Sequence, residues 1–86
     1  EKKYYSKEFE GDMEIVNLSG NISEMNNEAY IHLHISLADD TNKVVGGHLN
    51  YAYISATGEI IIDVIEGRVD RKYSDEIGLN LLDFNV

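Results

Sequence analysis

The 86-residue chain contains no cysteine, no proline and no tryptophan. Without cysteine, no disulfide can supplement the modest core of so small a domain, and we expect a reducing, cytoplasmic location. Without proline, nothing interrupts the backbone hydrogen bonds of a continuous strand. No stretch approaches the ~20 apolar residues of a membrane-spanning helix, so no membrane partner is expected. The remaining stabilising devices are a bound metal, association between copies of the chain, or more chain.

Basic residues are scarce as well, with 7 Lys and Arg against 16 Asp and Glu and a net charge of −9. Nucleic-acid binding draws most of its affinity from basic groups that displace phosphate counterions. We therefore expect DNA to be at most a weak partner of this acidic chain. High solubility is the simplest consequence of the charge.

The pattern of apolar residues predicts strands rather than helices. They alternate with polar residues or form short β-branched runs, and turn residues separate these runs. Short connections favour antiparallel pairing, because a parallel crossover needs a dozen or more residues. We expect one domain over residues 1–86, with a mainly antiparallel sheet and little helix. The expected strands are Lys3–Phe9, Met13–Ser23, Ala29–Leu37, Val44–Val45, Tyr51–Ala56, Glu59–Glu66 and Arg68–Tyr73, followed by a short helical turn capped at Ser74 and an apolar run at Leu79–Phe84.

Two of the three histidines lie in the strand predicted over residues 29–37. Side chains alternate between the faces of a strand, so His32 and His34 share one face, together with Tyr30. Their Cα atoms are about 6.5–7 Å apart, and imidazoles at this separation can converge on one ion. The opposite face is uniformly apolar and is expected to form the core; it carries Ala29, Ile31, Leu33, Ile35 and Leu37.

His48 is the third histidine, and a hairpin over the polar turn at residues 39–42 would return it beside His32 and His34. Gly46 and Gly47 precede it and allow another backbone or a ligand to approach closely. Imidazole suits Zn, Cu, Ni and Fe, and three protein ligands with one open position are typical of catalytic zinc. The alternative is that the three histidines are ordinary polar residues on a solvent face, and spacing alone does not decide.

No fourth ligand can be named from the sequence. Glu14, Glu59 and Asp63 are candidates by charge only, and the hydroxyl of Tyr30 could hydrogen-bond a metal-bound water. A basic cluster further along the chain either binds an anionic ligand or pairs with Asp75 and Glu76, and we expect the pairing. This cluster consists of Arg68, Arg71 and Lys72.

Three motifs keep their order along the chain and resemble the plants-and-prokaryotes-conserved (PPC) domain. They are Glu14–Ser23, the stretch Ile31-His32-Leu33-His34, and Gly46-Gly47-His48-Leu49. The closing segment Tyr73–Leu82 resembles the acidic-glycine-leucine ending of the same family. Family domains are longer, with an N-terminal strand and helix that have no counterpart before Glu1, so we expect the chain to be the C-terminal two-thirds of such a domain.

The resemblance implies an α+β fold on a curved antiparallel sheet, assembled as a homotrimer and similar to acetolactate decarboxylase. It implies that His32, His34 and His48 bind a divalent metal, commonly zinc. From the residues themselves, Gly46, Gly47 and Tyr30 are expected to support this site. Prokaryotic members carry a DNA-binding label, and the plant domain mediates assembly. The expected function is thus a metal-binding module of regulatory or assembly type. The alternative is a zinc-dependent enzyme acting on a small carbonyl or carboxylate compound.

Overall fold

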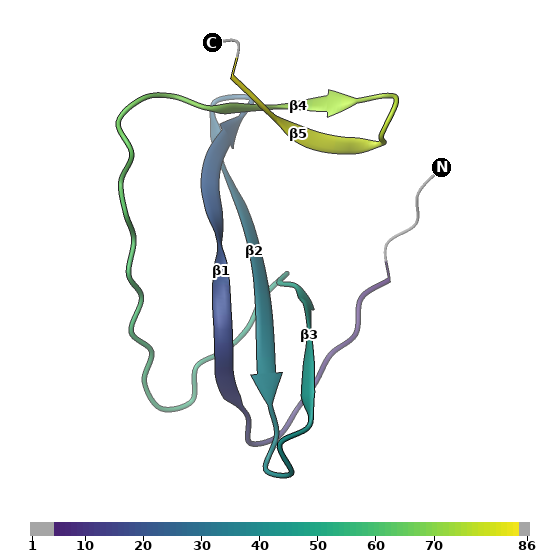
Figure 1. Cartoon of the computed structure of the whole chain (residues 1–86), viewed down its shortest axis with the longest axis vertical. Coiled ribbons are helices and arrows are strands. Elements are labelled where there is room, and N and C mark those ends of the chain that lie inside the picture. The colour runs from purple at the N-terminus through teal and green to yellow at the C-terminus, as the bar shows by residue number, and fades with distance from the viewer. Residues whose placement is uncertain (1–4, 85–86) are drawn as a thin grey trace.

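The computed structural model describes residues 5–84, which form one open, five-stranded sheet (Figure 1). The strand order is β3-β2-β1-β4-β5. None of the described residues is helical, so the expected α+β class is not confirmed and the architecture is mainly β. The strands are β1 (Glu14–Met25), β2 (Glu28–Ala38), β3 (Val44–His48), β4 (Asp70–Ser74) and β5 (Leu79–Asp83).

The long hairpin of β1 and β2 is the centre of the sheet. Asn26 and Asn27 form its two-residue turn with φ angles of 54° and 64°, which asparagine tolerates better than most residues. One extra residue, Val16, bulges from β1 where the register shifts between residues 15 and 17. Because of this bulge, Ile15 and Leu18 both pair with apolar residues of β2 instead of falling on opposite faces.

The sheet is mainly antiparallel, as expected, and the join between β1 and β4 is its one parallel pairing among the described strands. Glu24 pairs with Asp70, and the Glu24 backbone N–H donates to the Val69 carbonyl at 3.1 Å. Arg68 reinforces the join, with its Nε 3.2 Å from the carboxylate of Glu24 and 3.5 Å from that of Asp70. The connection over residues 49–69 is long enough for such a crossover.

Three expected strands are not formed. Residues 51–56 and 59–66 run extended without a backbone ladder, as does the described part of 3–9; Lys3 and Tyr4 lie outside the described residues. Side-chain hydrogen bonds still join the segment at 5–9 to residues 50 and 51. The Asn50 amide donates to Ser6 Oγ at 3.1 Å, and the Tyr51 hydroxyl donates to Glu8. Their β-branched and aromatic residues favour a strand, but a strand also needs a free edge to pair with.

The connection between β4 and β5 is a single turn closed by an i to i+4 hydrogen bond, the short helical turn expected from the sequence. The Gly78 N–H donates to the Ser74 carbonyl at 2.7 Å, and Ser74 Oγ accepts the N–H of Ile77 at 3.2 Å. Ser74 thus caps a single turn, as its residue type predicts. Gly78 then reverses the chain with a φ of 78°, a conformation that glycine adopts without strain.

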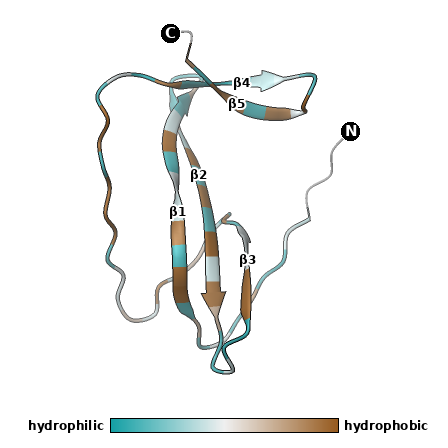
Figure 2. Ribbon diagram, viewed as in Figure 1, coloured by the Kyte–Doolittle hydropathy of each residue, from teal (hydrophilic) through white to brown (hydrophobic). Residues whose placement is uncertain are grey.

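The sheet is a single layer, and no described residue is fully buried. The radius of gyration is 15.6 Å, against about 12 Å for a compact domain of this length. Figure 2 shows apolar bands alternating with polar ones along β1 and β2. The apolar face expected to be core is therefore assembled but left open, with Ile22 57% and Ile31 60% exposed. No described helix is long and apolar enough to cross a membrane.

Candidate metal centre

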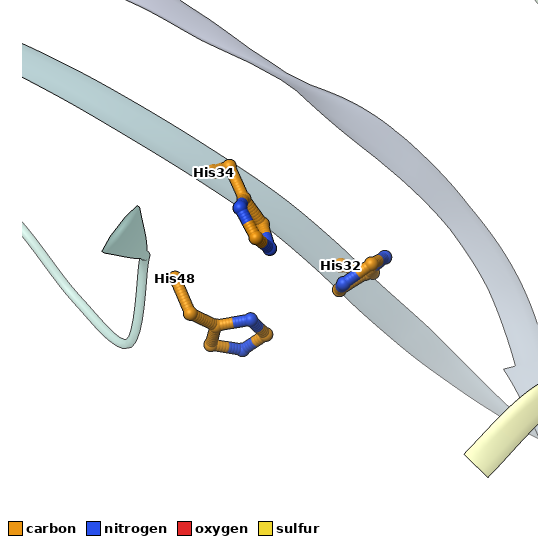
Figure 3. A group of neighbouring side chains, drawn as sticks. All are labelled: His32, His34 and His48. Carbon is orange, nitrogen blue, oxygen red and sulfur yellow. The ribbon is translucent and has the colours of Figure 1, made fainter. Parts of the chain in front are cut away.

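The three histidines lie together on the polar face of β2 and β3. Antiparallel partners share a face, and His34 is the register partner of His48. His32 lies two positions before His34 on β2 and so points to the same side (Figure 3). The hairpin predicted from the sequence thus brings the three side chains to one place.

The imidazoles surround a common point. Their ring centroids are 5.2 Å apart for His32 and His34, and 5.4 Å apart for His48 and each of the others. One ring nitrogen from each residue lies within 4.8 Å of the other two. His32 is half-buried, whereas His34 and His48 are exposed. The cluster is therefore built into the sheet at one side and open to solvent at the other.

A compact loop fixes the position of His48. Asp39 directly follows β2, and its Oδ1 accepts three hydrogen bonds: from the Thr41 N–H at 2.9 Å, the Thr41 hydroxyl at 2.7 Å and the Lys43 N–H at 2.9 Å. The Thr41 hydroxyl, followed by the two backbone donors, lowers the pKa of the Asp39 carboxyl. Asn42 completes the reversal with a φ of 65°. This loop sets the register that places His48 opposite His34.

Two glycines allow the three strands to lie close at the cluster. A methyl group on Gly20 of β1 would overlap the carbonyl oxygen of His32 and lie 2.8 Å from the Cα of Leu33. A methyl group on Gly46 of β3 would lie 2.6 Å from the carbonyl oxygen of Ile35. Gly46 thus allows β3 to approach β2 closely, whereas nothing lies within 4 Å of the equivalent point at Gly47.

The fold also changes the ionisation of the His32 side chain. Partial burial lowers its pKa, and the positive charge of Arg71 and the neighbouring imidazoles lower it further. A lowered pKa keeps the ring neutral over more of the physiological range. The neutral ring is the form that binds a metal ion.

Arg71 reaches across from β4 to the same polar face. Its Nε donates to Ser23 Oγ at 3.2 Å and its Nη2 to Asn21 Oδ1 at 3.0 Å, both on β1. Its Nη1 donates to the Asn80 carbonyl at 2.9 Å, and its guanidinium lies 4.9 Å from the ring centroid of Tyr30. Asn21 is the register partner of His32. The guanidinium is thus positioned at the side of the histidine cluster.

Other expected members of the site lie elsewhere. No carboxylate of residues 5–84 joins the three histidines within ligand distance, so Glu14, Glu59 and Asp63 are not brought to it. The Tyr30 hydroxyl accepts a hydrogen bond from the Asn80 amide at 3.4 Å. Tyr30 thus contacts Asn80 through its hydroxyl and Arg71 through its ring.

The expected pairing of the basic cluster with Asp75 and Glu76 is wrong. Arg68 pairs with acids of β1 and β4, and Arg71 forms the polar network just described. The position of Arg71 beside the histidines was not predicted from the sequence, because it depends on the parallel join of β4 to β1. Only the parallel pairing of β4 with β1 brings Arg71 next to its hydrogen-bonding partners on β1.

Comparison with known proteins identifies the family. The family model of the Plants and Prokaryotes Conserved (PCC) domain matches residues 1–66, and the chain belongs to this family. This is the family that the sequence motifs resemble. No curated protein sequence matches the chain significantly.

One solved structure shows the same fold. It is described as a "putative dna binding protein" from Bacteroides thetaiotaomicron, determined at 1.50 Å resolution, and it superposes with a TM-score of 0.81 at 40% sequence identity. The match covers 86% of this chain and 53% of that chain. The chain thus spans about half the length of the solved relative.

Proposed function

We propose that this PCC-domain chain binds one divalent metal ion, zinc in the first instance, through His32, His34 and His48. The observation that carries the proposal is the convergence of three imidazole nitrogens within 4.8 Å of one another. On a tetrahedral zinc with Zn–N distances of 2.0–2.1 Å, imidazole nitrogens lie about 3.3 Å apart. Small side-chain rotations supply the difference, since two of the three rings are exposed.

The donor set fits the metal chemically. Three neutral nitrogen donors and no thiolate suit Zn, with Cu, Ni and Fe as competitors. Three protein ligands leave a fourth position for water or another ligand, and a metal there would acidify the water or polarise a carbonyl group. Gly20 and Gly46 hold the strands together beneath the cluster, so the ligands come from a paired sheet rather than from mobile loops.

Metal analysis of the purified protein tests the proposal. We expect about one zinc per chain in the wild type and in Ser36→Ala, which alters the same strand without removing an imidazole. The double variant His32→Ala, His34→Ala should lose the metal. Equal metal content in the double variant and the wild type would reject the site.

We also infer that copies of the chain associate, with the homotrimer of the family resemblance as the expected state. The support is apolar surface that the described residues leave open. Ile61 is 93% exposed, Val64 91% and Ile65 87%. Contiguous apolar surface of this kind marks an interaction site.

The biological role that we propose is a regulatory or assembly module. DNA is a partner to test, because the solved relative is described as a "putative dna binding protein". The net charge of −9 argues that direct contact is weak. The alternative, a zinc-dependent enzyme acting on a small carbonyl or carboxylate compound, requires a ligand-binding group beside the metal.

A further inference from the structure

Within the described residues 5–84, Arg71 is a fixed cation with no ion-pair partner. Among residues 5–84, the ion pairs between side chains involve Arg68, whereas Arg71 donates only to the neutral oxygens of Ser23, Asn80 and Asn21. The chain has 16 acidic residues against 7 basic ones, so an arginine on the sheet that meets no carboxylate is unexpected.

The guanidinium is held in one orientation but is not saturated. Three of its five N–H groups are used, one on each nitrogen, so each terminal nitrogen keeps one N–H without a partner in the described part of the chain. The ring of Tyr30 lies 4.9 Å from the guanidinium carbon and supports one face. A guanidinium fixed in this way loses little side-chain freedom when it binds a ligand.

Arg71 lies beside the histidines, so its unpaired N–H groups are available to a ligand bound near them. Asn21, which accepts from Arg71, is paired with His32 across β1 and β2. A metal ion on the histidines would therefore place two positive centres side by side, an arrangement that an intervening anion stabilises.

We propose that Arg71 and the metal position of His32, His34 and His48 together form a binding site for a small monocarboxylate. The proposal rests on the metal site proposed above and names the ligand class of that site. The planar guanidinium fork matches the two oxygens of a carboxylate. A single arginine on a chain of net charge −9 suits a monoanion better than a phosphate dianion or a nucleic acid.

The test is a titration with acetate. In the zinc-loaded protein, binding is monitored through the side-chain Nε–H resonance of Arg71. In the cobalt-substituted form, it is monitored through the visible spectrum. Arg71→Gln is compared with Lys72→Gln, which removes the same charge one position along β4. Lys72 is exposed, and strand alternation points it to the opposite face. We expect Arg71→Gln to weaken acetate binding about tenfold and Lys72→Gln to leave it unchanged.

Equal acetate affinities in the wild type and both variants would overturn the proposal, as would phosphate binding more tightly than acetate. Arg71→Gln removes hydrogen bonds between strands, so its fold is checked by circular dichroism. If it does not fold, the Arg71 resonance of the wild type decides, and a resonance that acetate does not shift overturns the proposal. Zinc content is measured in the same samples. A wild-type protein that does not bind zinc would rule out the metal site itself. An Arg71→Gln variant with full zinc content and the acetate affinity of the wild type would rule out only the role of Arg71.

Discussion

His34 and His48 lie directly opposite each other across β2 and β3, with their ring centroids 5.4 Å apart. This pairing exists because the loop after β2 fixes the hairpin register. A shift of one residue would turn His48 to the other face of the sheet. The geometry of the proposed metal site therefore depends on residues that do not touch the metal.

Asp39→Asn should weaken both the hairpin and zinc binding at neutral pH. The carboxylate accepts three hydrogen bonds that hold the loop, and a neutral amide oxygen accepts them less strongly. We expect a lower melting temperature and a higher zinc dissociation constant, measured by thermal denaturation and competitive chelation. Asp40→Asn, which removes the same charge at the neighbouring exposed position, serves as the control and should change neither value.

The effect of Asp39 should depend on pH in a defined direction. The pKa of this carboxyl is lower in the folded chain than its ordinary value. Its stabilising contribution is therefore present above the unfolded-state pKa and is lost as the pH falls through the folded-state pKa. The difference in melting temperature between wild type and Asp39→Asn should shrink on acidification. A difference that stays constant from neutral pH to strong acid would contradict this role.

Gly20→Ala should separate β1 from β2 beneath the histidines. The added methyl group would overlap the His32 carbonyl oxygen, which belongs to the backbone and has little freedom to move. We expect a loss of about 1–3 kcal/mol in the free energy of unfolding, together with weaker zinc binding. Gly58→Ala is the matched control, since its nearest contact would be an ordinary 3.6 Å to Ile54. Urea denaturation of both variants measures the difference, and equal midpoints would refute the account.

The histidine cluster was predictable from the sequence because it depends on local rules. Strand alternation places His32 and His34 on one face, and a short loop rich in Asp, Thr and Asn returns His48 to them. The β1–β2 hairpin was predictable for the same reason, with Asn26 and Asn27 marking its turn. Each of these features involves residues that lie close together along the chain.

The features that sequence reasoning missed depend on contacts between distant segments. The parallel pairing of Glu24 with Asp70 has no local signal, and it alone brings Arg71 to the polar face. The apolar runs at 51–56 and 59–66 have the composition of strands, yet they form no backbone ladder in the described part of the chain. Composition predicts the tendency to pair, and the partner decides whether the strand forms.

Self-association should depend on the exposed apolar segment before β4. Ile61→Asp adds a charge where the isoleucine is 93% exposed, and we expect it to shift the chain from the associated state towards monomer. Thr57→Asp adds the same charge at an exposed polar position of the connection between β3 and β4. It should leave the mass of the assembly in solution unchanged. Sedimentation velocity over a range of concentrations measures both. A wild-type chain that is monomeric at all concentrations would rule out the inferred assembly.

DNA binding by this chain should be weak and sensitive to salt. The acidic surface offers few groups that displace phosphate counterions. In fluorescence anisotropy with a labelled duplex, we expect any binding at about 50 mM salt to vanish at about 150 mM. Tight, sequence-selective binding at the higher salt concentration would show that the chain uses a local contact that its overall charge conceals.

The most direct test of the central claim is X-ray absorption at the zinc edge, which counts the imidazoles around the metal. The account predicts three imidazole nitrogens at about 2.0–2.1 Å in the wild type, with two remaining in His48→Gln. A zinc ion surrounded by oxygen alone, with a spectrum that His48→Gln does not change, would contradict it.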